Sequence, residues 1–117
     1  MHPQFVKLIL RALIMSVACF FTWHGAFAST TSPGNASVTI LNYAFSPKTL
    51  DIASGTTVTW VNRDEEPHSV QNASGTLRLQ SGVLQPKQGY SHTFTKPGTY
   101  NYRCGIHPYM QGAVIVK

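Results

Sequence analysis

Cys104-Gly105-Ile106-His107-Pro108-Tyr109-Met110 is the most informative stretch, because it places a thiol, an imidazole and a thioether at three-residue intervals near the end of the chain. Alternating residues lead into it, with Tyr100, Tyr102 and Cys104 on one face of a predicted strand. The Cys therefore leaves that strand from its core side. The pattern predicts a metal site in a loop at one end of a β domain, packed against the core.

The donor atoms of this loop favour copper. A Cys, two His and a weakly held axial Met form the ligand set of blue-copper sites, and Cys104, His107 and Met110 supply three of these four. His68, which follows a predicted strand well upstream, is the candidate for the second imidazole. Zinc is the competing structural metal, but it takes Cys, His or carboxylate ligands rather than a thioether. A covalent haem site would need a Cys-x-x-Cys-His motif, which the sequence lacks.

Residues 1–28 have the pattern of a secretory signal peptide. Lys7 and Arg11 provide a basic region, an apolar stretch follows, and Ala26-Phe27-Ala28 matches the small-x-small cleavage pattern. A membrane anchor is the alternative, but the apolar run is shorter than the ~20 residues that a spanning helix needs. Residues 29–36, rich in Ser, Thr, Pro and Gly, are expected to form a flexible leader before a single domain over residues 37–117.

Charge and cysteine content narrow the function classes. The whole chain has a formal charge of +5, and the seven Lys and Arg and four acidic residues after residue 28 leave +3. These basic residues are scattered, so nucleic-acid binding is not expected, and the modest charge is compatible with a mildly acidic partner. Cys19 lies in the expected signal peptide, which leaves Cys104 as the one Cys of an exported chain. A free thiol in an oxidising compartment requires an explanation, and metal ligation provides one.

The rest of the chain predicts an all-β domain. Short strands at this spacing are typical of a β-sandwich. Residues 72–89 are polar and irregular, with room for one helical turn, and no long helical period occurs. The segments rich in β-branched and aromatic residues, each bounded by turn-forming residues, are 38–43, 56–61, 90–94, 99–104 and 112–117.

On these residues the chain resembles the cupredoxins, and among them the plastocyanin-like and amicyanin-like proteins, over about residues 37–117. The resemblance implies a Greek-key β-sandwich of the cupredoxin type that binds one type 1 copper ion. It implies His68, Cys104 and His107 as the trigonal ligands and Met110 as the long axial ligand. The Cys-x2-His-x2-Met spacing is the short form seen in amicyanins. The other matching segments are Phe45-Ser46-Pro47, Leu50-Asp51-Ile52-Ala53-Ser54-Gly55, Val58-Thr59-Trp60-Val61-Asn62, Pro67-His68, Ser81-Gly82, Phe94 and Gly98-Thr99-Tyr100.

Two residues depart from the family pattern. Ser69 follows the first ligand His, where many relatives have an Asn that ties the two ligand loops together, and the shorter Ser is expected to do this less well. Ile106 stands where many short-loop relatives have Pro, so it keeps an N–H that is expected to donate a hydrogen bond to the Cys104 sulfur. Gly105 makes the loop more flexible. His92, on a predicted strand, is expected to be a partly buried histidine rather than a ligand.

The resemblance implies a periplasmic, monomeric one-electron carrier that cycles between Cu(I) and Cu(II) and is not an enzyme. His107, within an apolar surface of Pro67, Pro108 and Tyr109, would meet transient redox partners, by analogy a dehydrogenase and a c-type cytochrome. No nucleic acid and no stable membrane association are expected.

Two other functions are weighed against electron transfer. Copper binding and delivery without electron transfer is the alternative, although the single Met after residue 28 argues against an open, Met-rich delivery site. An oxidase or reductase is disfavoured, because no His adjoins Cys104 to connect it to a second copper centre.

Overall fold

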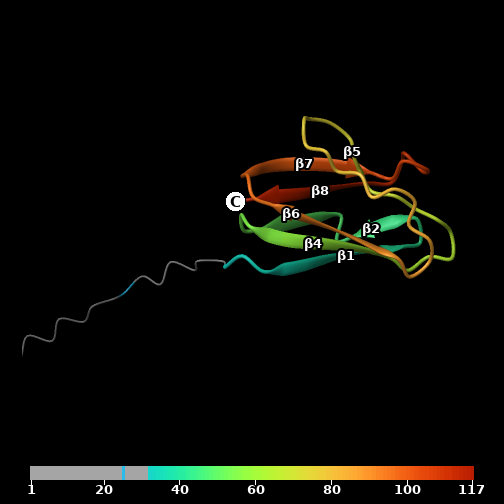
Figure 1. Cartoon of the computed structure of the whole chain (residues 1–117), viewed down its shortest axis with the longest axis horizontal. Coiled ribbons are helices and arrows are strands. Elements are labelled where there is room, and N and C mark those ends of the chain that lie inside the picture. Colours follow the sequence, from blue (N-terminus) through green and yellow to red (C-terminus); the bar gives the residue numbers. More distant parts are fainter. Residues whose placement is uncertain (1–24, 26–31) are drawn as a thin grey trace, which may run out of the picture.

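Two four-stranded sheets packed face to face make up the part of the chain that the computed structural model describes, which is Gly25 and residues 32–117 (Figure 1). The first sheet has the strand order β2-β1-β4-β6, and the second has the order β3-β8-β7-β5. The predicted all-β sandwich is confirmed. The strands are β1 (Asn35–Leu41), β2 (Ala44–Ser46), β3 (Thr49–Ile52), β4 (Thr56–Asn62), β5 (Gln71–Asn72), β6 (Gly89–Phe94), β7 (Gly98–Arg103) and β8 (Gln111–Val116).

Each sheet contains one parallel pair. β1 lies parallel to β4 and β3 lies parallel to β8, while the other strand pairs are antiparallel. Parallel neighbours cannot be joined by a tight turn. The chain between β1 and β4 therefore passes through the other sheet as β3, and this crossing connects the two layers.

Strand β4 shows how the sequence pattern forms the core. Its residues alternate between buried and half-exposed, and Val58, Trp60 and Asn62 are fully buried. The Trp60 ring packs edge-on against Tyr102 at 5.3 Å between centroids and lies 6.3 Å from Phe94. Because β4 and β6 belong to one sheet and β7 to the other, this aromatic cluster joins the two sheets.

The first strand begins earlier than the sequence indicates. β1 starts at Asn35, inside the residues 29–36 that are predicted to be a flexible leader. The first two residues of β1 pair in parallel with β4, so main-chain hydrogen bonding orders a segment whose composition favours a loop. The expected signal peptide lies outside the described residues, apart from Gly25.

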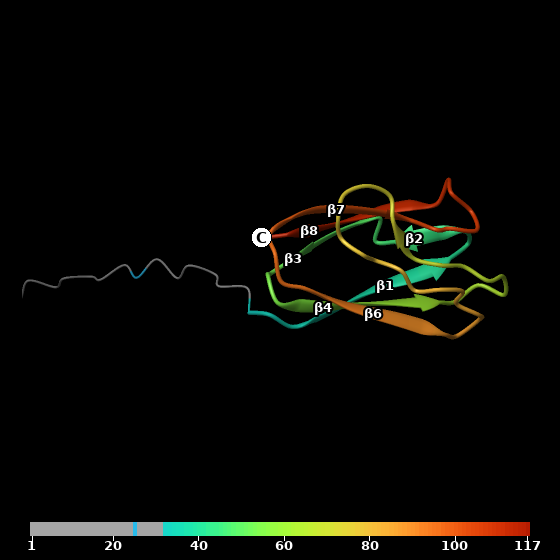
Figure 2. The same cartoon turned by 45° about the horizontal axis from the view of Figure 1, so that its top comes forward.

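The loops that carry the predicted ligands gather at one end of the sandwich. The turn after β1, the loop after β4 and the loop after β7 all lie at the end away from the C-terminus (Figures 1 and 2). The face of β7 that packs on the core leads directly to Cys104, which is fully buried, as the alternation of its residues predicts. The fold thus places the Cys104–Met110 loop next to the loop that contains His68.

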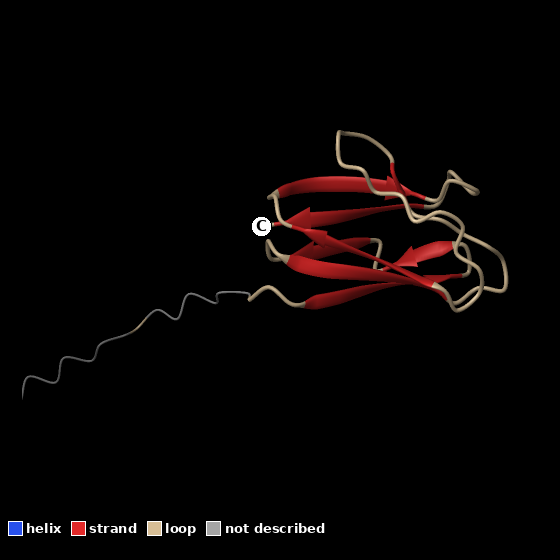
Figure 3. Ribbon diagram, in the orientation of Figure 1, coloured by secondary structure: helices blue, strands red, loops and turns tan. Residues whose placement is uncertain are grey.

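Residues 72–89 are irregular, as predicted, and the helical turn for which they had room does not form: the described part of the chain consists only of strands, turns and loops (Figure 3). Residues 73–88 instead form a connecting segment whose main chain pairs with the loop after β4. Leu84 and His68 exchange two main-chain hydrogen bonds of 3.1 and 2.7 Å, which hold the backbone of the predicted ligand. Within the described residues, the structure contains no helix with the length and apolar character to cross a membrane.

Candidate metal centre

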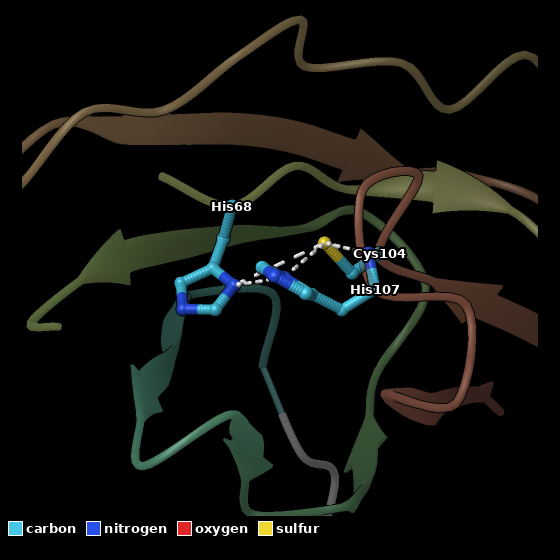
Figure 4. Close-up of side chains that lie close together, drawn as sticks. All are labelled: His68, Cys104 and His107. Atoms are coloured by element: carbon cyan, nitrogen blue, oxygen red, sulfur yellow. Dashed lines mark hydrogen bonds between the residues drawn. The ribbon is translucent and has the colours of Figure 1, made fainter. Parts of the chain in front are cut away.

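Three of the predicted ligand side chains converge between the two loops (Figure 4). The Sγ atom of Cys104 lies 3.9 Å from the Nδ1 atoms of both His68 and His107, and these two Nδ1 atoms are 3.2 Å apart. His68 and Cys104 are fully buried, whereas His107 is half-buried. In the described part of the chain, this is the one group of three His, Cys, Asp or Glu side chains close enough to share an ion.

The spacing of these donor atoms fits a metal ion. A point in their plane lies about 2.1 Å from all three, within the roughly 2.0–2.3 Å at which His nitrogen and Cys sulfur bind zinc. Both imidazoles present the same nitrogen to this point. One thiolate and two imidazoles, with a thioether in the same loop, are the donors of a copper site rather than of a structural zinc site.

The loop from Cys104 to Met110 is closed by its own main chain. The N–H of Cys104 donates to the carbonyl of Met110 at 3.0 Å, and the N–H of Met110 donates to the carbonyl of His107 at 2.9 Å. Met110 is only 2% exposed. Three of the four predicted ligands therefore belong to one hydrogen-bonded loop, and His68 enters from the other.

Gly105 has a steric role rather than the flexible one that the sequence indicates. A Cβ atom at this position would lie 2.5 Å from the Oε1 atom of Gln71 and 3.0 Å from the Oγ atom of Ser69. No larger residue fits unless these neighbours move. Gly105 therefore permits the two ligand loops to approach each other closely.

Two main-chain amides donate hydrogen bonds to the Cys104 sulfur. They belong to Ser69, at 3.3 Å, and to His107, at 3.4 Å. The prediction that Ile106 provides the second amide is wrong. The turn instead directs the N–H of His107, three positions after Cys104, toward Sγ. These two hydrogen bonds hold the sulfur in place from both ligand loops.

Ser69 joins the two ligand loops in the way that the family's Asn is expected to do. Its hydroxyl accepts a hydrogen bond from the Gly105 N–H at 2.8 Å, and the side chain is 8% exposed. The short hydroxyl reaches this amide because Gly105 lets the loops come close. The expected weakness of Ser at this position therefore has a structural compensation in Gly105.

Asn62, the last residue of β4, organises the loop that carries His68. Its buried side chain donates to the carbonyls of Glu66 and Leu84 at 2.8 and 3.0 Å and accepts the N–H of Asp64 at 2.9 Å. The Asn62 side chain thus connects the beginning and the end of the short loop after β4 with each other and with the connecting segment of residues 73–88.

Asp64 is a functional residue that sequence reasoning missed. Its Oδ2 atom lies 2.8 Å from the Nε2 atom of His68, which leaves Nδ1 of that ring to face Cys104. The carboxylate also accepts the N–H groups of Asn42 at 2.6 Å and Tyr43 at 3.0 Å. Burial would raise the pKa of Asp64, but hydrogen bonds from the Tyr43 and Asn42 amides and from His68 lower it overall. A carboxylate behind a ligand histidine fixes the tautomer and orientation of the ring.

Tyr43 was also missed by the sequence reasoning. Its ring lies edge-on to the imidazoles of His68 and His107, with centroid distances of 5.4 and 5.1 Å. The apolar surface predicted around His107 from Pro67, Pro108 and Tyr109 gains two further exposed side chains, those of Tyr43 and Ile106. The sequence pattern placed Tyr43 at the end of a predicted strand over residues 38–43, whereas β1 ends at Leu41 and Tyr43 lies in the turn before β2.

His92 lies on β6, outside the cluster of donor atoms. Its ring is half-buried and packs edge-on against Phe94 at 4.7 Å. Burial lowers the pKa of this imidazole. The residue is thus a partly buried histidine on the sheet, as expected.

Comparisons with known proteins agree with this geometry. The family model described as a cupredoxin-like domain matches residues 12–116. The chain is 38% identical to the amicyanin of Paracoccus denitrificans over 93 residues, which cover 77% of this chain and 71% of that protein.

Solved structures give the same result for the fold. A variant of amicyanin in its Cu(I) form matches with a TM-score of 0.67 and 37% identity, covering 71% of this chain and 82% of that one. A copper-containing nitrite reductase from Thermus scotoductus SA-01 matches with a TM-score of 0.66 and 35% identity. That match covers 74% of this chain but only 22% of the reductase.

Proposed function

Because the chain belongs to the cupredoxin-like family, we propose that His68, Cys104 and His107 hold its one copper ion in a trigonal arrangement, with Met110 as the weak axial ligand. The observation that carries this assignment is the convergence of one Sγ and two Nδ1 atoms at 3.2 to 3.9 Å. The protein is a type 1 copper electron carrier. Copper supplies a centre that takes up and releases one electron.

The residues around the ligands restrict the movement of the ligand side chains. Asp64 fixes the ring of His68, and the amides of Ser69 and His107 hold the Cys104 sulfur. These contacts are made by the protein itself and hold the ligand atoms from both loops. Little rearrangement on gain or loss of an electron is what a rapid carrier requires.

Electron transfer fits the burial of the site better than copper delivery does. His68 and Cys104 are fully buried and Met110 is 2% exposed, so only one of the four predicted ligands, the half-buried His107, is open to a recipient protein. Enzymatic activity is also not proposed. Arg103 and Gly105 flank Cys104, so the chain has no adjacent His to pass electrons on to a second copper centre.

We also propose export and transient partners. Residues 1–28 direct the chain to the periplasm, where the domain acts as a monomer. The exposed side chains of Tyr43, Ile106 and Tyr109 around His107 form a small apolar surface for brief contact with a dehydrogenase and a c-type cytochrome. Recovery of the protein in the periplasmic fraction with Ser29 at its N-terminus would support export. Retention of residues 1–28 would contradict it.

The copper assignment is tested with Cys104→Ser. The wild-type protein is expected to bind one copper ion and to be intensely blue when oxidised, because the colour arises from charge transfer between the thiolate and Cu(II). Cys104→Ser is expected to lose the blue absorption band. Ser91→Ala, which alters an exposed hydroxyl on β6, is the control and is expected to stay blue. A blue Cys104→Ser protein would refute the assignment.

A further inference from the structure

Tyr43 occupies a backbone position that suits glycine better. Asn42 and Tyr43 form the two-residue turn between β1 and β2, and their φ angles are 53° and 57°. Hairpin turns with two positive φ angles prefer Asn followed by Gly. Asn42 follows this preference, but Tyr43 places a bulky aromatic side chain in the left-handed region, where it is strained. Strain of this kind is commonly retained where a side chain has a function.

The ring of Tyr43 lies against the two histidines of the metal site. Its plane is nearly perpendicular to both ligand imidazoles, at 86° to His68 and 82° to His107. Tyr109 contacts only His107, at 6.0 Å between centroids, and is 69% exposed. Among the described Tyr, Phe and Trp residues, Tyr43 is therefore the one that contacts both imidazoles. His68 is fully buried although its loop lies at the surface of the sandwich.

Asp64 connects this turn to the ligand. The same carboxylate accepts the N–H groups of Asn42 and Tyr43 and the Nε2 of His68. Two hydrogen bonds to this carboxylate therefore hold the positive-φ turn, and a third holds the ligand ring.

We propose that Tyr43 is a positioning residue of the copper site: its ring covers the imidazoles of His68 and His107 and keeps water away from them. This inference rests on the proposed function. An apolar cover around a metal site controls its solvent access and therefore its reduction potential and metal retention. The role belongs to the ring, and the hydroxyl group is not required.

The test compares four copper-loaded proteins: wild type, Tyr43→Gly, Tyr43→Phe and Asn42→Gly. Tyr43→Gly removes the ring and relieves the turn, so it is expected to fold. Water then reaches the site and stabilises the more highly charged Cu(II) form, so the reduction potential falls. Copper release to bathocuproine disulfonate is expected to accelerate by about 10–100-fold, as for other losses around ligand residues. Tyr43→Phe and Asn42→Gly are expected to match wild type in both measurements.

Any other result would overturn either this proposal or the copper assignment. An unchanged potential and release rate in Tyr43→Gly would overturn the proposal. Equal effects in Tyr43→Phe would assign the role to the hydroxyl, and equal effects in Asn42→Gly would assign it to the turn, so both would also overturn it. Tyr43→Asn, a residue that also tolerates positive φ, replaces Tyr43→Gly if the latter does not fold. A wild-type protein that is not blue would instead refute the copper assignment.

Discussion

Replacing Ser69 with Ala removes the side-chain hydrogen bond that joins the two ligand loops. The Oγ of Ser69 accepts the Gly105 N–H at 2.8 Å, and this contact links positions far apart in the sequence. A neutral hydrogen bond contributes about 0.5–1.5 kcal/mol, and an amide left without an acceptor adds to the loss. We therefore expect the metal-free protein to lose about 1–2 kcal/mol of unfolding free energy. For a domain of this size, each 1 kcal/mol corresponds to a decrease of roughly 4–8 °C in Tm.

The measurement is urea unfolding of the metal-free protein with Ser91→Ala as the matched control. Ser91 hydrogen-bonds Thr59 at 2.7 Å on the exposed face of the sheet, so its loss is expected to change the unfolding free energy by less than about 0.5 kcal/mol. The Ser69 amide, which donates to the Cys104 sulfur, survives the substitution, so the blue colour should remain. If Ser69→Ala is no less stable than Ser91→Ala, the hydroxyl does not connect the loops in solution.

Four further outcomes are expected. Tyr102→Phe should be as stable as wild type at neutral pH, because the Tyr102 hydroxyl is buried without a hydrogen-bond partner. Burial raises the pKa of Tyr102 from 10.0 to about 12, so wild-type stability should fall as the pH rises through this interval, and pH-dependent unfolding should show a flatter profile for Tyr102→Phe. Burial lowers the pKa of His92, so as the pH falls the unfolded state binds the proton before the folded state does. Wild-type stability should therefore fall as the pH drops below about 6.5. Equal pH profiles of stability for wild type and His92→Gln would contradict this. Met110→Gln should retain copper but lower the reduction potential, because an oxygen donor stabilises Cu(II) more than a thioether does, and a raised potential in voltammetry would show that Met110 is not axial. Ile106→Pro should leave the potential nearly unchanged, since the amide that donates to Cys104 belongs to His107; a large decrease would restore the role first expected for Ile106.

Three of the four predicted ligands could be read from the sequence because their chemistry is local. Cys104, His107 and Met110 lie in one short loop, and the period of the preceding strand places Cys104 on the core side. The all-β sandwich followed from strand composition and turn residues. These features depend on residues that are neighbours in the chain, and such neighbours are what a sequence pattern reports.

The surroundings of the ligands depend on contacts between distant parts of the chain. The two amide hydrogen bonds that hold the Asp64 carboxylate require the turn after β1 and the loop after β4 to meet, and their meeting depends on the parallel pairing of β1 with β4. The amide that faces the Cys104 sulfur depends on how one turn is closed, and Ile106 and His107 cannot be distinguished by composition.

What the sequence determined by itself was therefore the donor set and the fold class, including the strand that leads to Cys104. Only the tertiary structure decided that the amides of Asn42 and Tyr43 hold Asp64, that Tyr43 lies over both imidazoles and that Gly105 admits the Ser69 hydroxyl. The physical reason is that periodicity specifies which face of an element a side chain occupies. Its partner across the fold is set by strand register, backbone dihedral angles and the space left between packed loops.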